Sequence, residues 1–154
     1  MAVGGNPKKN KTNAVDSVIA CLQIQAYLNN LREEDASTWE MRVGINTGEI
    51  VAGVLETKRP LYDIWGSAVN IASRIQDEGK SQKVNISEST YRKIKPYFIC
   101  TARGGILAKN VGVINMYFVD AIKAPLSISG EGKSPNAHFW TYVNANIDSK
   151  IKYA

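Results

Sequence analysis

The sequence has 154 residues, 44% of them hydrophobic and 21% charged, which is long enough and apolar enough for one domain with its own core. Its formal net charge is +5, but the basic residues are scattered, which favours a solvated surface or an anionic small substrate over nucleic acid. The chain has no apolar run of the roughly 18 residues that a membrane span needs, and its opening, MAVGGNPKKNKTNAV, has no apolar stretch typical of a signal peptide. Cys21 and Cys100 are predicted to be buried thiols in a reducing compartment, which favours the cytoplasm.

The first predicted elements are a helix and a β-hairpin. Apolar residues recur at helical spacing over residues 13–31, which predicts an amphipathic helix with Thr12 or Asn13 as its N-cap. The stretch WEMRVGINTGEIVAGVL, residues 39–55, alternates on either side of a short Asn-Thr-Gly segment. This pattern is typical of a β-hairpin with a short glycine-containing loop.

The rest of the chain alternates between short strands and helices. In chain order, the sequence predicts a polar break at 56–60, a strand at 61–65, a helix from Gly66 to about Gly79, a strand at 83–87, a helix capped by Ser87 that ends before Pro96, strands at 98–110 and 111–120, and a short helix in the tail. Helices and hairpins without a regular βαβ rhythm predict the α+β class.

Four polar residues stand out as candidates for chemistry. Asn70 and Arg74 are four residues apart, so they share one face of the predicted helix, and that face is not the apolar one. The arginine fork suits phosphate oxygens, although a solvated face with an arginine salt bridge explains the same spacing. Asp63 lies among aromatic residues at the end of a strand, so we expect a partly buried carboxylate that needs a donor: an adenine amine, a lysine or a backbone amide. Lys109, in a late strand, is placed either to reach a phosphate or to extend into solvent.

Other chemical patterns are missing from the sequence. His138 is the single histidine, and no Cys/His spacing indicates a metal site. Three glycines, Gly44, Gly48 and Gly53, are interpreted as serving the hairpin turn and close packing rather than a ligand. The sequence therefore predicts no metal ligands of its own.

Three segments carry a family resemblance: RVGINTGEIVAGV, YDIWGSAVNIASRI and RGGILAKNVGVINMYFVD. In this order they resemble the C-terminal half of the catalytic domain of class III adenylate and guanylate cyclases, and the segments MAVGGNP and SPNAHFW are similar to bacterial members. The resemblance implies an α+β, ferredoxin-like fold that is N-terminally truncated. It also implies a partial catalytic domain over residues 1–122 and a C-terminal tail over residues 123–154.

The resemblance implies a role for each of five residues. Asp63 falls at the purine-selecting position, where an acid accompanies adenylate cyclases and a cysteine is more common in guanylate cyclases. Ile64 would touch the purine through its backbone, Asn70 would orient the ribose, and Lys109 would bind the terminal phosphates. Arg74 would stabilise the phosphates in the transition state. The implied function is an adenylate cyclase that converts ATP to 3′,5′-cyclic AMP and pyrophosphate in intracellular signalling.

The family's metals are expected to come from outside this sequence. Family members bind two divalent ions, Mg²⁺ or Mn²⁺, through aspartates that would precede Met1. Their active sites form between two protomers arranged head to tail. We therefore expect the chain alone to be inactive, with ATP and either a second copy or a complementing cyclase protomer as partners. A non-catalytic, cyclase-like module for dimerisation or regulation is the alternative.

Overall fold

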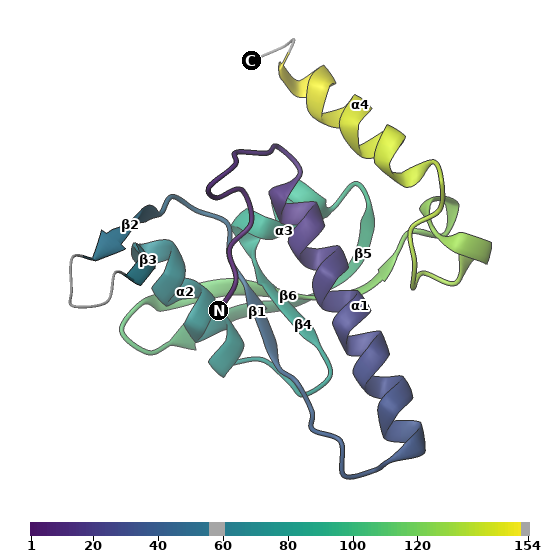
Figure 1. Ribbon diagram of the computed structural model, residues 1–154, viewed down its shortest axis with the longest axis horizontal. Coiled ribbons are helices and arrows are strands. Elements are labelled where there is room, and N and C mark those ends of the chain that lie inside the picture. Colours follow the sequence, from purple (N-terminus) through teal and green to yellow (C-terminus); the bar gives the residue numbers. More distant parts are fainter. Residues whose placement is uncertain (56–60, 152–154) are drawn as a thin grey trace.

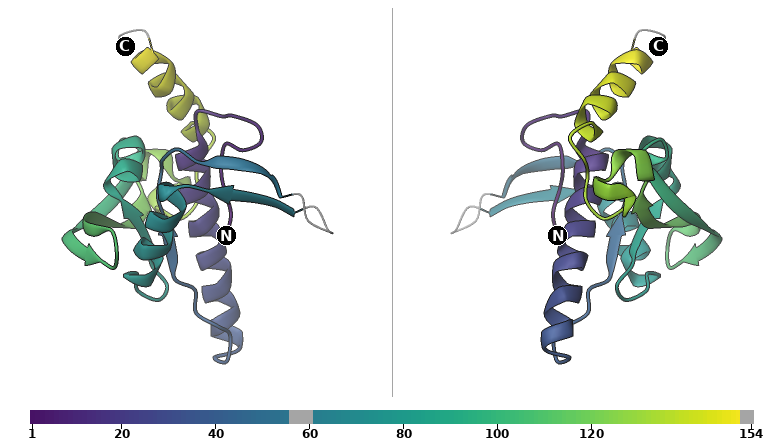
Figure 2. Two further views of the ribbon diagram at one scale, coloured as in Figure 1. Left: turned by 90° about the vertical axis from the view of Figure 1, so that its left-hand side faces the viewer. Right: turned by 90° about the vertical axis from the view of Figure 1, so that its right-hand side faces the viewer.

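The computed structural model describes residues 1–55 and 61–151, and its centre is a four-stranded sheet with helices packed against it (Figure 1). The predicted polar break at 56–60 lies outside these residues. The sheet order is β1 (Val43–Ile45), β4 (Val84–Ser87), β6 (Gly112–Ile122) and β5 (Phe98–Ala108). β1 and β4 are parallel, and the other neighbours are antiparallel. β2 (Val51–Leu55) and β3 (Leu61–Trp65) form a separate antiparallel arm that projects from the body (Figures 1 and 2).

The helices confirm the predicted α+β class. They are α1 (Asn13–Glu34), α2 (Ser67–Asp77), α3 (Glu88–Ile94) and α4 (Phe139–Ile151), with short 3₁₀ turns at Ala124–Leu126 and Ile128–Gly130. The cap of α3 is the predicted one, since the Ser87 hydroxyl accepts the Thr90 N–H at 3.3 Å. Within the two described ranges, none of the helices combines the length and apolarity needed to cross a membrane.

The predicted hairpin over residues 39–55 is wrong, because its two strands belong to different sheets. β1 pairs with β4, with Val43 opposite Val84, whereas β2 pairs with β3, with Gly53 opposite Asp63. Alternation with period two identifies a strand and its buried face but does not identify the strand beside it. Of the two roles predicted for Gly44, a turn and close packing, the structure shows close packing, because Gly44 allows β1 to run against the backbone of α2.

The two faces of the sheet carry different clusters of buried side chains. Along β4, Val84 and Ile86 belong to the larger cluster, whereas Asn85 between them donates its amide to the Ile75 carbonyl of α2. Because successive side chains of a strand point to opposite faces, α2 lies on the face opposite the larger cluster. A smaller cluster of Ile75, Ala108 and Met116 joins α2 to β5 and β6. α2 is thereby fixed on the sheet beside the arm.

The segment after β6 packs on the rest of the chain. Leu126, Phe139 and Val143 belong to the larger cluster, together with α1 side chains such as Val18. The Phe139 ring also meets the Tyr97 ring at 6.2 Å. α4 then extends away from the sheet (Figure 1). The division at residues 122 and 123 stays a prediction, although the tail shares the core of the preceding residues.

Candidate active site on β3 and α2

The connection from β3 to α2 places the candidate residues close together in the chain. β3 ends at Trp65 and α2 begins at Ser67, so the direction changes at Gly66. Gly66 has φ 139° and ψ 162°, a region that only glycine adopts readily. A strand that carries Asp63 and Ile64 therefore leads directly into a helix that carries Asn70 and Arg74.

Asp63 is half-buried, as predicted, but lies in the middle of β3 rather than at its end. Its Oδ1 accepts the backbone N–H of Ile64 at 2.8 Å. The partner in the structure is thus the backbone amide, one of the donors expected from the sequence. Among the described residues Oδ2 has no partner, so one carboxylate oxygen is available to a donor from outside.

An open hollow of about 440 Å³ lies beside Asp63, within the usual size range for small-molecule sites. Its lining is mostly apolar and consists of Met1, Ala2, Val3, Tyr62, Asp63, Ile64 and Val69. The N-terminal segment is tied to β3 because the Asn6 amide donates to the Tyr62 hydroxyl at 2.6 Å. Apolar walls with a single carboxylate suit a flat, hydrogen-bond-donating ring.

Arg74 is engaged by an acid of its own helix. Its Nη1 donates to Asp77 Oδ2 at 2.7 Å, with 35% of the arginine and 46% of the aspartate side chain exposed. The Asn70 side chain is exposed and makes no hydrogen bond to any described residue. Both predicted residues therefore lie on α2. The structure also contains an arginine salt bridge on this helix, which was the other explanation for the spacing of Asn70 and Arg74.

Lys109 lies in the turn after β5, not in a strand, and is exposed. No polar contact joins it to the other candidate residues within 1–55 and 61–151. Its neighbour Ala108 packs in the same buried cluster as Ile75, which adjoins Arg74 in the chain. The turn and the second half of α2 are thus held by one cluster, while the lysine amine is not brought to Arg74.

Two asparagines that sequence reasoning did not select hold α2 in place. The Asn46 amide donates to the Ala68 carbonyl in the first turn at 3.1 Å, and the Asn85 amide donates to the Ile75 carbonyl in the last turn at 2.8 Å. Asn85 is fully buried. A polar residue between Val84 and Ile86 was the available signal, because a polar side chain in a buried strand needs a partner.

The acids that the structure describes do not assemble a metal site. Among the residues that the structure describes, no three histidine, cysteine or acidic side chains lie close enough together to hold an ion. The side chains present here thus do not fit the two divalent ions implied by the resemblance.

Comparison with known proteins shows the family. The sequence profile of the adenylate and guanylate cyclase catalytic domain matches residues 1–121, so the chain belongs to this family. It is 29% identical over 119 residues to an adenylate cyclase from Mycobacterium bovis, an alignment that covers 77% of this chain and 27% of the relative. The family generally uses divalent metal ions.

Solved structures of cyclase domains share the fold. The guanylate cyclase domain of RhGC from Catenaria anguillulae, in complex with GTP, matches with a TM-score of 0.73 and 30% identity over 78% of this chain and 66% of that chain. The adenylyl cyclase CyaB from P. aeruginosa matches with a TM-score of 0.69 and 28% identity over 76% of this chain and 64% of that chain. The predicted class III cyclase fold is confirmed. Proteins of both nucleotide specificities are similar to this chain, which spans about a quarter of the curated relative's length.

Proposed function

We propose that this chain contributes the base-reading and phosphate-binding half of an adenylate cyclase active site. The observation that carries the proposal is the hollow beside β3, which is lined by Asp63 and Ile64 and continues at Val69 onto the helix of Asn70 and Arg74. A purine in the hollow would direct its ribose and phosphates toward α2.

The reaction needs donors where negative charge develops. The ribose 3′-hydroxyl gives up its proton to water and attacks the α-phosphorus, the bond from that phosphorus to the bridging oxygen breaks, and pyrophosphate leaves with the electron pair. In the proposal Asn70 orients the ribose, Arg74 donates to the phosphate oxygens as charge builds, and Lys109 binds the terminal phosphates. A preorganised donor of this kind typically contributes on the order of 3–4 kcal/mol to lowering the barrier.

The carboxylate of Asp63 supports ATP over GTP as the substrate. Its free oxygen is an acceptor, and adenine presents an exocyclic amine at the position where guanine presents a carbonyl oxygen. An ionised carboxylate accepts hydrogen bonds but cannot donate one, so it would repel that carbonyl. The half-buried setting of Asp63 strengthens both effects relative to water.

The proposal includes a second protomer. The divalent ions would be held by aspartates from outside the described residues, in a complementing cyclase protomer. The β2–β3 arm supports such an association, since it exposes the apolar side chains of Val51, Val54 and Tyr62. On this proposal the chain alone makes little or no cyclic AMP.

The test is cyclic AMP formation from ATP with Mn²⁺ or Mg²⁺, measured first with this chain alone. It is then measured in a mixture with a cyclase protomer that keeps its metal aspartates but lacks the asparagine–arginine pair. We expect activity in the mixture only. In that mixture Arg74→Ala should lower kcat on the order of 10²–10³-fold with less effect on ATP binding. Asp63→Cys should reduce the preference for ATP over GTP.

Two results would count against the proposal. Unchanged turnover with Arg74→Ala would show that Arg74 does not take part in the reaction. A folded chain that associates with the protomer yet yields no cyclic AMP would favour the alternative function, a non-catalytic module for dimerisation or regulation.

A further inference from the structure

Asp77 occupies a position where an acid is unfavourable for the helix itself. It is the last residue of α2, and the C-terminal end of a helix carries partial negative charge. Asp77 also lies at the surface, so it contributes nothing to the core. Its one polar contact among the described residues is the ion pair with Arg74.

The ion pair holds the Arg74 guanidinium toward the end of α2. Asn70 lies four residues before Arg74 and Asp77 lies three residues after it. At a rise of 1.5 Å per residue, Asn70 and Asp77 are about 10 Å apart along the helix axis. A ligand bound between Asn70 and Arg74 therefore lies on the opposite side of Arg74 from Asp77. A guanidinium fork that is turned toward Asp77 is turned away from such a ligand, so the two partners compete for the orientation of the fork.

We propose that Asp77 is a positioning residue that holds Arg74 in a resting orientation, which phosphate groups must displace. The inference rests on the proposed function in assigning Arg74 to phosphate groups. Asp77 sets how readily Arg74 becomes available, without itself touching the nucleotide. Because both side chains are partly exposed, the competition is modest. Removing the Asp77 carboxylate should strengthen phosphate binding about two- to fivefold, which corresponds to the free energy of an exposed ion pair.

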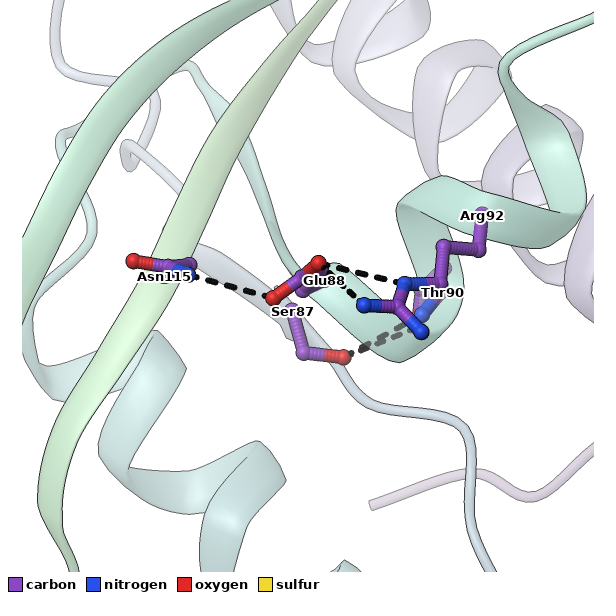
Figure 3. A network of polar contacts seen from close by, with 5 residues as sticks. All are labelled: Ser87, Glu88, Thr90, Arg92 and Asn115. Atoms are coloured by element: carbon purple, nitrogen blue, oxygen red, sulfur yellow. Dashed lines mark hydrogen bonds and ion pairs between the residues drawn. The ribbon is translucent and has the colours of Figure 1, made fainter.

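The experiment measures binding of inorganic tripolyphosphate to the chain alone by calorimetry, at low salt. Asp77→Asn should bind it two- to fivefold more tightly than the unaltered protein. The matched control is Glu88→Gln on α3, which removes the same charge and releases Arg92 from a comparable pair at 2.6 Å (Figure 3). The control should not reproduce the gain, since Arg92 is not beside the candidate site.

The decisive comparison is the double variant. In an Arg74→Ala background, Asp77→Asn should give no gain, because Asp77 acts through Arg74 alone. The inference is overturned if the gain persists without Arg74, if Glu88→Gln gives an equal gain, or if Asp77→Asn changes nothing. Should Asp77→Asn fail to fold, Asp77→Ser gives the same comparison.

The readout also separates this inference from the proposed function. Tighter tripolyphosphate binding through Arg74, with no cyclic AMP in the mixed assay, would keep the inference and remove the cyclase activity. Cyclic AMP in the mixed assay, with no gain from Asp77→Asn, would support the cyclase activity and overturn the inference about Asp77.

Discussion

Gly44→Ala should displace the helix that carries Asn70 and Arg74. A Cβ at Gly44 would lie 2.2 Å from the Gln76 nitrogen and 2.6 Å from the Ala72 carbonyl oxygen, and both distances are well short of ordinary contact, which begins at 3.4 Å. Both atoms belong to the α2 backbone, so no flexible side chain can give way. Overpacking a tight contact costs about 1–3 kcal/mol, and a backbone clash belongs at the upper end of that range or above it.

The measurement is urea denaturation, with Gly53→Ala as the matched control. Gly53 is also a strand glycine, but among the described residues a Cβ there would meet only Trp65, at 3.8 Å. We expect Gly44→Ala to lower the free energy of unfolding by about 3 kcal/mol and Gly53→Ala to change it by less than about 1 kcal/mol. In the mixed assay, a 1 Å displacement of α2 should also lower turnover on the order of 10²-fold. Equal stability of the two variants would show that α2 does not depend on this approach.

Two further predictions concern the stability of the fold and the thiols. Ser87→Ala removes the cap of α3 and should lower the free energy of unfolding by about 1 kcal/mol in urea denaturation. Lys93→Ala, at an exposed position of the same helix, is the comparison, and an equal loss there would contradict a capping role. Burial raises the pKa of the Cys100 thiol from 9.0 to about 12, so alkylation by iodoacetamide at pH 9 should be much slower in the folded protein than in urea. Because the unfolded thiol ionises first, this group should lower stability as the pH rises from about 9 toward 12, and equal alkylation rates in the two states would refute the burial.

Features that depend on local sequence could be predicted, and features that depend on strand pairing could not. The helical period fixed α1 to within a few residues at its end, and the hydroxyl of Ser87 identified the start of α3. The partners of residues 43–45 and 51–55 were predicted wrongly, because alternation is the same in a hairpin and in two separate sheets. The positions of β1 and β4 in the sequence do not indicate that these two strands pair.

In the candidate site, too, the local placement of residues could be predicted and their contact partners could not. That Asn70 and Arg74 share α2 follows from their spacing, and the half-buried state of Asp63 follows from its aromatic neighbours. The partners of these residues did not follow. Asp77 lies three residues after Arg74 and Asn70 lies four residues before it, and both spacings allow contact on a helix, so spacing alone does not say which of the two binds the guanidinium. Lys109 was assigned to a strand because apolar residues precede it, whereas the strand ends at Ala108.

The position of α2 is determined by residues distant from it in the sequence. Asn46 and Asn85 each donate an amide to one of its carbonyls, one in the first turn and one in the last, and Gly44 sets how closely the helix approaches the sheet. Gly44 lies in β1, Asn46 directly follows β1, and Asn85 lies in β4. These two strands are parallel neighbours, a pairing that the sequence did not predict. Since Asn70 and Arg74 lie between the two bonded carbonyls, their backbone is held at both ends. The remaining freedom lies in the Arg74 side chain, and the carboxylate of Asp77 restrains it.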